Sequence, residues 1–349
     1  MQEIVLVFLG ALALLFLSRK IAKRVGLVDK PNARKQHSGH IPLVGGVSIY
    51  LSLWIIYFLQ PEWLPDSSIY MICATLLIVV GVLDDKFDLP VMPRMALQAS
   101  VAGIMMYNGL YLYSLGNILF GYDLVLGVLG YGITLLAVVG AINAFNMVDG
   151  IDGLLGALSS VTFAGLAVVF WMGGRDSMAL WCLCLMVACL PYILLNLGIP
   201  WGRKFKVFMG DAGSTLIGFT VIWLLIVATQ GEDAVMQPVT ALWLIAVPLM
   251  DMIRVMIVRI RRGDSPFKPD REHLHHLLLN RNMKPVKALL TACTISFMLA
   301  LFGIVLEKIN TNQMLALMLF LVLSFLYSIW CNKDTLKSSK QCKIMKENR

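Results

Sequence analysis

Eleven long runs without charged residues follow one another along this chain, and they restrict what it can fold into. An α-helix needs about 20 apolar residues to cross roughly 30 Å of hydrocarbon, and most of the runs are close to that length. Only 14% of the 349 residues are charged, against about 25% in soluble proteins. We therefore predict an all-α integral membrane protein with about eleven transmembrane helices. The runs are Ile4–Leu17, Ile41–Leu59, Ser67–Leu83, Met95–Tyr107, Leu124–Phe145, Leu154–Met172, Ser177–Ile199, Ala212–Gln230, Ala234–Met250, Ala288–Leu306 and Gln313–Cys331.

The lysines and arginines predict the orientation of these helices. If all eleven runs cross, the segments between alternate runs lie on one side, and they carry 27 of the 29 lysines and arginines; only Arg175 and Lys308 lie opposite. Basic residues remain on the cytoplasmic side, so we expect a periplasmic N-terminus and a cytoplasmic C-terminus. The short run Met95–Tyr107 is kept because, without it, the C-terminal basic segments would lie opposite the N-terminal one. These segments are 18–40, 84–94, 146–153, 200–211, 251–287 and 332–349.

Composition also limits the possible domain organisation and binding partners. The net charge of +8 comes from basic residues beside apolar runs, which is typical of contact with anionic lipid and not with nucleic acid. The seven cysteines form no CxxC pair, so neither a zinc ribbon nor a disulfide framework is expected. The first run precedes its basic residues, which indicates a retained helix and not a cleaved signal. We predict one membrane domain over residues 1–331 and a basic cytoplasmic tail over 332–349.

One polar stretch, Asn143–Gly153, interrupts this apolar pattern at the end of a run. Asp149 and Asp152 are three residues apart, and each precedes a glycine, so a tight turn could direct both carboxylates the same way. That arrangement suits a divalent cation or a hydroxyl-rich ligand. An ordinary loop between two membrane helices is the alternative.

Three further clusters fall on the same predicted side. Asp84 and Asp85 end one run, and adjacent carboxylates usually need a cation or a basic partner. Asp211 opens a helix, where it is either a simple cap or a ligand. The stretch Ser265–His276 holds three of the five histidines; these could bind zinc, but the many carboxylates and the lack of a nearby cysteine favour Mg²⁺ or Mn²⁺.

The shared location of these groups favours a functional site. Carboxylates suit a metal, basic and imidazole groups suit phosphates, and the apolar surroundings suit a lipid substrate. Phosphoryl transfer needs mainly neutralisation of charge and in-line positioning. The pattern therefore predicts phosphate chemistry between one lipid and one soluble substrate.

Six motifs resemble the polyprenyl-phosphate N-acetylhexosamine-1-phosphate transferases, the family of the MraY, TagO and WecA enzymes. The His-x-His-His form and the stretches Ala141–Leu155 and Pro248–Met252 look most like the WecA branch, which makes undecaprenyl-diphospho-N-acetylglucosamine for enterobacterial common antigen and O-antigen. MraY is expected to carry three consecutive histidines. The resemblance covers nearly the whole chain and rests on Val28–Pro31, Ile41–Gly46, Leu83–Asp85, Asn146–Gly153, Phe208–Ser214 and His273–His276.

The resemblance implies a bacterial inner-membrane enzyme with its active site facing the cytoplasm. Undecaprenyl phosphate would attack the sugar-linked phosphorus of UDP-N-acetylglucosamine, and UMP would leave. Mg²⁺, or Mn²⁺, would be the cofactor. It implies Asp84 and Asp85 at the acceptor phosphate as catalytic residues, Asp152 and Asp211 as metal ligands, and Asn146, Asp149 and Phe208 at the nucleotide. Contacts to phosphate or sugar are expected from Arg94, Arg259, Arg271, His273, His275 and His276.

Three alternatives remain open on the sequence. The donor could be another UDP-N-acetylhexosamine, because the aspartate and glycine motifs do not distinguish these sugars. A covalent aspartyl-phosphate route competes with direct attack. Membrane carboxylates also mark ion-coupled transporters, although here they lie at helix ends and no pair of broken helices suggests inverted repeats. Homo-oligomerisation is open as well.

Overall fold

The computed structural model describes residues 2–30, 39–119, 121–266 and 272–347, the last fifteen of these by their backbone alone. Apart from two short strands, its regular structure is helical. The strands β1 (Val28–Asp29) and β2 (Ile41–Pro42) pair antiparallel. The helices are α1 (Gln2–Val25), α2 (Gly45–Leu59), η1 (Pro61–Trp63), α3 (Ser67–Phe87), α4 (Val91–Tyr107), α5 (Leu129–Met147), α6 (Leu154–Met172), α7 (Asp176–Leu197), η2 (Arg203–Phe205), α8 (Gly210–Thr229), α9 (Pro238–Leu244), α10 (Ala246–Arg261), α11 (Leu274–Asn280), α12 (Pro285–Lys308) and α13 (Gln313–Glu347).

Each predicted apolar run contains at least one helix, and the prediction of an α-helical membrane protein is confirmed. Within the described ranges, eight helices are long and apolar enough to cross a membrane, or nine if α9 and α10 form one bent span. The 15-residue α2 is apolar but shorter, and the 17-residue α4 does not meet that test. The total of eleven crossings therefore stays a prediction.

The run Ala234–Met250 was expected as one helix, and this was wrong. The chain turns by 84° between α9 and α10. Pro248 lies in the first turn of α10, and a proline there has no N–H for the Leu244 carbonyl and clashes with it. That carbonyl instead accepts a hydrogen bond from Thr162 Oγ1 at 3.2 Å. The break therefore has a local cause and a polar group that compensates for it.

Two other boundaries differ from the expected ones. The run from Leu124 becomes helical only at Leu129, because residues 108–119 and 121–128 form loop segments whose backbones pair, as between Ser114 and Val125. The helix α13 continues through the predicted start of the tail at residue 332 and ends at Glu347. A helix of that length spans about 52 Å. It therefore extends well beyond the thickness of the hydrocarbon.

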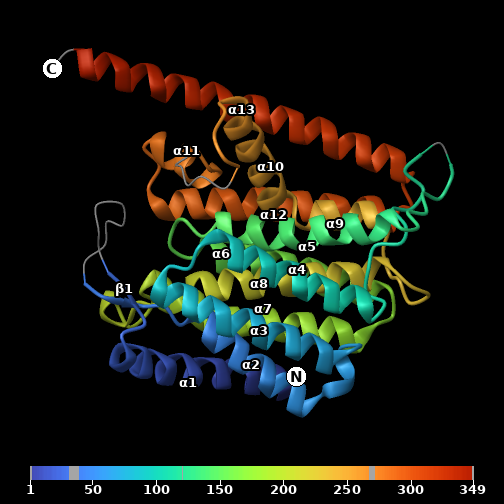
Figure 1. The fold of residues 1–349 in the computed structure, drawn as a ribbon, viewed down its shortest axis with the longest axis horizontal. Coiled ribbons are helices and arrows are strands. Elements are labelled where there is room, and N and C mark those ends of the chain that lie inside the picture. The colour runs from blue at the N-terminus through green and yellow to red at the C-terminus, as the bar shows by residue number, and fades with distance from the viewer. Residues whose placement is uncertain (1, 31–38, 120, 267–271, 348–349) are drawn as a thin grey trace.

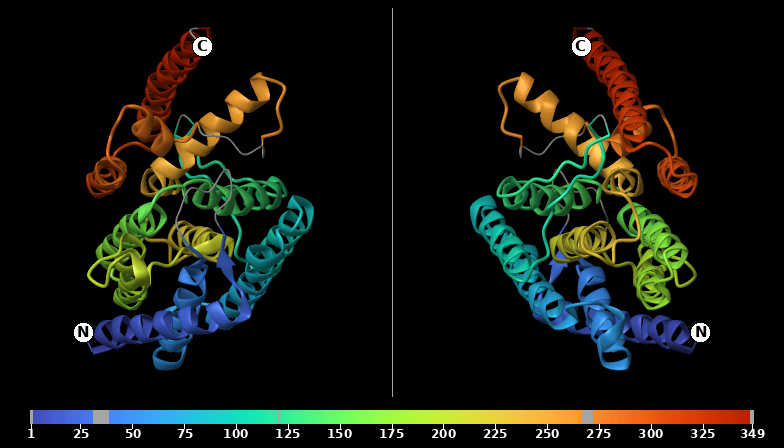
Figure 2. Two further views of the ribbon diagram at one scale, coloured as in Figure 1. Left: turned by 90° about the vertical axis from the view of Figure 1, so that its left-hand side faces the viewer. Right: turned by 90° about the vertical axis from the view of Figure 1, so that its right-hand side faces the viewer.

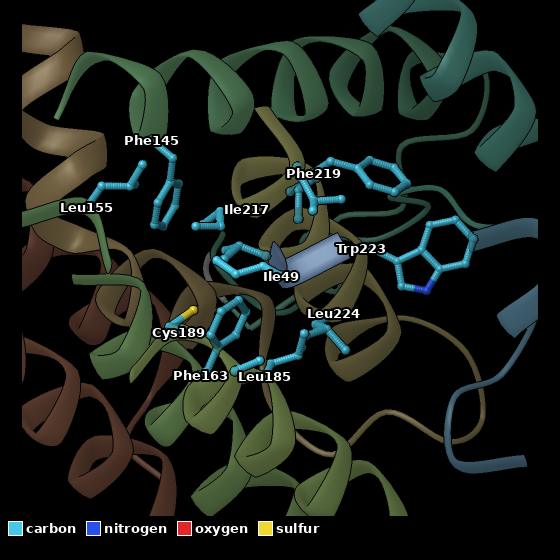
Figure 3. Close-up of a cluster of buried hydrophobic side chains, with 14 of the residues drawn as sticks. Ile49, Phe145, Leu155, Phe163, Leu185, Cys189, Ile217, Phe219, Trp223 and Leu224 are labelled. Atoms are coloured by element: carbon cyan, nitrogen blue, oxygen red, sulfur yellow. The ribbon is translucent and has the colours of Figure 1, made fainter. Parts of the chain in front are cut away.

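The helix α8 forms the centre of the bundle. In its apolar stretch 83% of the residues are buried, against 17–67% in the other candidate spans, and it packs against α2, α3, α5 and α6. Figure 3 shows its side chains Ile217 and Leu224 among residues of α5, α6 and α7. The rings of Phe219 and Trp223 instead contact Tyr70 of α3, with ring centroids 5.7 Å and 5.4 Å away. Since lipid is as apolar as these side chains, close packing holds such helices together.

The two ends of the bundle carry different features. Figure 1 shows β1 and α11 at one end and the N-terminus at the other. The final helix α13 runs the length of the molecule, and its C-terminal end lies on the side of α11 (Figure 1). Figure 2 shows α10 projecting away from the other helices. The clusters singled out in the sequence flank the end where β1 and α11 lie.

Candidate active site

The first turn of α8 is held by a carboxylate from another helix. Asp85, at the end of α3, accepts hydrogen bonds from the backbone N–H groups of Asp211 at 2.7 Å and of Ala212 at 3.2 Å. Free N–H groups at a helix start favour an anion. Gly210 has φ +79°, and a Cβ there would lie 2.3 Å from Asp85 Oδ2. Only glycine therefore allows Asp85 to reach this position.

Small residues let the backbones of three helices meet around that turn. A Cβ on Gly46 of α2 would lie 2.2 Å from the Cα of Gly213, and one on Gly81 of α3 would lie 2.3 Å from the Cα of Ala212. Small residues at helix crossings permit this close approach in membranes. The polar start of α8 is thus placed inside the bundle, between α2 and α3.

Asp84 is engaged differently from its neighbour Asp85. Its Oδ2 accepts a hydrogen bond and ion pair from Arg94 at 2.8 Å, and its Oδ1 accepts the N–H of Leu89 at 2.8 Å. Asp84 is buried, whereas the Arg94 side chain is 34% exposed. The pair therefore presents a fixed, accessible guanidinium beside the carboxylates.

The expected nucleotide residues lie next to Asp211. The Asn146 amide donates to Asp211 Oδ1 and to Ser214 Oγ, both at 2.8 Å. Part of the Asp149 side chain is exposed, while the many protein atoms around it reduce its hydration. This loss of hydration, together with the negative charges of Asp211 and Asp152, raises the pKa of Asp149 to about 7. Two adjacent polar segments, α5 to α6 and the start of α8, thus form one site.

Asp152 and Phe208 share a basic partner. The Lys206 ammonium lies 2.6 Å from Asp152 Oδ2 and 5.2 Å from the centroid of the Phe208 ring. The Phe208 backbone is fixed by the early motif: its N–H donates to the carbonyl of Pro42, and its own carbonyl accepts from Val44 and Gly45. The N-terminal segment therefore sets the position of the half-buried Phe208 ring.

The charge and spacing of the carboxylates decide whether they can hold a metal ion. Asp85, Asp149 and Asp211 form no ion pair within the described ranges, while Asp84 and Asp152 are paired with Arg94 and Lys206. Excess negative charge on hard oxygen donors suits Mg²⁺. In the part of the chain that the structure describes, no three His, Cys, Asp or Glu side chains are grouped closely enough to hold an ion as they stand. The carboxylates thus fit a metal ion in charge and donor type, but they would have to move closer together to coordinate it.

Residues 273–276, here called the histidine segment, are fixed by a buried acid that the sequence motifs did not indicate. The Asp251 carboxylate of α10 lies 2.7 Å from His273 Nδ1 and accepts the N–H of Leu274 at 3.0 Å. It also accepts the hydroxyl of Tyr327, from α13, at 2.8 Å. His273 Nε2 lies 3.4 Å from Arg259 Nη2, and both side chains are buried.

His275 joins the histidine segment to the loop that carries Asp149 and Asp152, here called the aspartate loop. A Cβ on Gly150 would lie 1.9 Å from His275 Nε2, so the ring packs directly on the loop. Burial and the neighbouring His276 and His273 rings lower the pKa of His275 to about 3, which keeps its ring neutral. The His276 ring lies 4.2 Å from that of His275. Arg271 lies outside the described residues.

Sequence reasoning missed several positioning residues. Asp251, Arg254 and Tyr327 lie within or beside apolar runs, and Asn196 bridges the two loops by accepting from Gly153 N–H and donating to the Val207 carbonyl. A signal existed for Asp251 and Arg254, because ionisable groups on membrane helices are rarely without a role. Tyr327 and Asn196 carry no such signal.

Acidic, amide, basic and imidazole side chains thus border one end of an α-helical membrane bundle, which defines a polytopic membrane protein equipped for phosphate chemistry. The sequence pattern of glycosyl transferase family 4 matches residues 67–229, and the chain belongs to this family.

Relatives match almost the whole chain. An undecaprenyl-phosphate α-N-acetylglucosaminyl 1-phosphate transferase of Escherichia coli strain K12 is 49% identical over 99% of this chain and 94% of its own length. Enzymes of the same name from Salmonella typhimurium and Haemophilus influenzae are 49% and 46% identical, over 99% and 94% of this chain and 94% and 92% of their own lengths. The predicted family is confirmed.

Proposed function

We propose that this protein transfers N-acetylglucosamine 1-phosphate from UDP-N-acetylglucosamine to undecaprenyl phosphate. A phosphate oxygen of the acceptor attacks the sugar-linked phosphorus, the bond to the UMP oxygen breaks, and UMP leaves with that bond's electron pair. The product is undecaprenyl-diphospho-N-acetylglucosamine, which begins the lipid-linked synthesis of enterobacterial common antigen and O-antigen. The near-full-length similarity to enzymes of this name supports the proposal.

The observation that carries the proposal is the meeting of three separated motifs around the start of α8. Asp85 accepts hydrogen bonds from the N–H groups of α8, and the Asn146 amide donates to Asp211. Asp211 in turn lies close enough to Asp149 to raise the pKa of Asp149. These groups come from α3, the last turn of α5 with the loop after it, and α8 itself. A phosphorylated substrate placed there would meet carboxylates, an amide and a helix start together.

We assign the acceptor phosphate to the Asp84, Asp85 and Arg94 end. Arg94 is aimed by Asp84 and is partly exposed, so it can receive an anion. Because the second pKa of a phosphate monoester is near 6, the acceptor is largely ionised at neutral pH and needs no strong base. Asp84 and Asp85 then act by aligning the acceptor, Asp84 through Arg94 and Asp85 through the start of α8.

The nucleotide belongs at the other end of the site, where Asn146, Asp149 and Phe208 lie. Phe208 offers a partly exposed ring for the uracil, held by backbone hydrogen bonds to residues 42–45. His273, His275, His276, Arg259 and Arg271 would contact the diphosphate or the sugar. His275 already lies against the aspartate loop, which brings this segment to the donor.

Mg²⁺, with Mn²⁺ as the alternative, would be held by Asp211 and Asp152. Bound there, it would neutralise charge on the diphosphate. Asp211 keeps Oδ2 clear of the Asn146 hydrogen bond, whereas Asp152 would have to give up its ion pair with Lys206. Lys206 would then be released toward the substrate phosphates.

We place the site on the cytoplasmic face of the bacterial inner membrane, where UDP-sugars are made, following the distribution of basic residues. An ion-coupled transporter is disfavoured because Asp84, Asp85 and Asp211 lie at helix ends. Asp84 is also paired with Arg94, and Asp85 binds the N–H of Asp211. No observation favours another UDP-N-acetylhexosamine over N-acetylglucosamine.

The test is a transfer assay on membranes containing the protein, with undecaprenyl phosphate, Mg²⁺ and UDP-N-acetylglucosamine labelled in the sugar. We expect a labelled lipid and an equal amount of UMP. Membranes with the Asp211→Asn variant are the matched control, and UDP-N-acetylgalactosamine tests sugar choice. UMP release without a labelled lipid would contradict the proposal.

A further inference from the structure

Asp251 is the most enclosed acid beside the histidine segment, and its two oxygens have different surroundings. It is 1% exposed and lies in α10. Three donors point at Oδ1: the N–H of Leu274 at 3.0 Å, the hydroxyl of Tyr327 at 2.8 Å and the Arg254 guanidinium at 3.4 Å. Oδ2 faces His273 Nδ1 at 2.7 Å. The carboxylate is thus held in one orientation.

Both neighbours of the His273 ring select the same tautomer. A carboxylate only accepts hydrogen bonds, so Nδ1 must carry the proton. On the other side, Arg259 Nη2 lies 3.4 Å from Nε2, and a guanidinium only donates, so Nε2 must be the acceptor. His273 is therefore a neutral bridge between a fixed anion and a cation.

We propose that Asp251 is a positioning residue for the transfer reaction, acting through His273 to orient the Arg259 guanidinium. The inference rests on the proposed function, in which Arg259 and His273 contact the diphosphate or sugar. Arg254 supports the same arrangement, because its Nη2 also donates to the carbonyl of Glu272, the residue before His273. Tyr327 connects the network to α13, so the last helix helps to fix the site.

The variant Asp251→Asn reverses the hydrogen bond without changing the size of the side chain. Its amide oxygen must face the three donors at the Oδ1 position, so its NH₂ group points at Nδ1. His273 then has to accept at Nδ1 and carry its proton on Nε2, which places two donors, Nε2–H and Arg259, against each other. A wrong histidine tautomer of this kind costs a serine protease about 10⁴-fold in kcat. We expect a fall in kcat of at least about 100-fold.

The primary test reads the tautomer directly. The full-length protein, with ¹⁵N-labelled histidine and in lipid nanodiscs, should show His273 protonated at Nδ1, assigned by loss of the signal in His273→Gln. Asp251→Asn should move the proton to Nε2, and Asp251→Glu should keep it on Nδ1. A wild-type His273 protonated only at Nε2 would overturn the proposal even if every variant failed to fold.

Activity and binding separate positioning from a merely structural role. In Asp251→Asn, UMP affinity should stay within about threefold, because the nucleotide end lies at Asn146 and Phe208, while kcat falls. The matched control Asp123→Asn makes the same change in the 108–128 loop, where Asp123 meets Ser114, and should leave kcat unchanged.

Two outcomes on the active protein oppose the inference. An unchanged kcat with a moved proton would overturn it, and so would parallel losses of UMP binding and kcat, since those indicate a merely structural role for Asp251. A wild-type protein without transferase activity would instead refute the proposed function, while the tautomer measurement would still decide what Asp251 does to His273.

Discussion

Asp211 has a backbone role and a side-chain role at the start of α8. Its N–H is bound by Asp85, and its carboxylate accepts from Asn146. Asp211→Asn keeps the size of the side chain but removes the charge that a hard cation needs. We expect transfer activity to be nearly abolished while the protein remains folded and inserted. A radiometric transfer assay with a Mg²⁺ titration measures this activity. Activity within about tenfold of wild type, a difference of roughly 1.4 kcal/mol in the activation barrier, would show that Asp211 is a structural residue and not a metal ligand.

Phe208 and the Asp84–Asp85 pair should separate the two substrates. Phe208→Ala removes ring stacking worth about 1–3 kcal/mol and should weaken UDP-sugar binding about five- to a hundredfold, with the apparent lipid affinity nearly unchanged. Asp84→Asn should lower kcat at saturating UDP-sugar with little effect on nucleotide affinity, because it releases Arg94. Calorimetric UMP binding and steady-state kinetics measure both. The opposite pattern would show that the substrate ends are exchanged.

His275 predicts a pH dependence of stability. Burial lowers its pKa to about 3, whereas an exposed histidine titrates near 6.5. The unfolded chain therefore binds a proton that the folded chain excludes, so this residue lowers stability as pH falls from about 6.5 toward 3. His275→Gln should flatten that part of the thermal-midpoint profile in detergent. An equal slope in both proteins would show that His275 is not buried as a neutral ring.

At the residue scale the sequence indicated the candidate site residues but not their partners. The motifs identified Asp84, Asp85, Asp149 and Asp211, because acidic residues at the ends of apolar runs stand out. They did not indicate that Asp84 would be paired with Arg94 while Asp85 binds the start of α8, since that difference depends on where α4 and α8 pack. Of the expected residues, Arg271 lies outside the described chain.

At the element scale, the crossing of α2 and α8 limits which residues can be accommodated. A Cβ on Gly46 would lie 2.2 Å from the backbone of Gly213, and neither backbone can move without displacing the first turn of α8. Gly46→Ala should therefore destabilise the protein by about 1–3 kcal/mol and reduce activity. Gly132→Ala, at an open position of α5 with nothing nearby, is the control and should gain slightly from helix propensity. Equal unfolding midpoints in the two variants would refute the crossing.

Element boundaries show where a one-dimensional pattern is insufficient. Hydropathy located α3, α6 and α8 closely, because their uncharged stretches match their lengths. It could not show the turn at Ile245, since apolar residues continue across it and only Pro248 marks the spot. The compensating Thr162 comes from α6, about eighty positions away in the sequence.

For the whole molecule, the predicted topology determines from which side of the membrane each loop can be labelled. Single cysteines introduced at residues 150 and 268 should react only from the cytoplasmic side, and one at residue 233 only from the periplasm, because of the asymmetric distribution of basic residues. Labelling of intact cells with a membrane-impermeant maleimide, before and after permeabilisation, measures this in a background where the native cysteines are replaced. Reaction at residue 268 in intact cells would invert the assignment.

The contact between Tyr327 and Asp251 also bears on how the protein is made. Synthesis proceeds from the N-terminus, so α2, α3 and α8 can assemble the carboxylate end while the ribosome is still translating the rest. The imidazole end then waits for the final helix, since the hydroxyl that completes the Asp251 shell is contributed near the end of the chain. A nascent chain released before α13 would therefore insert and hold its aspartates together, yet lack the finished histidine arrangement.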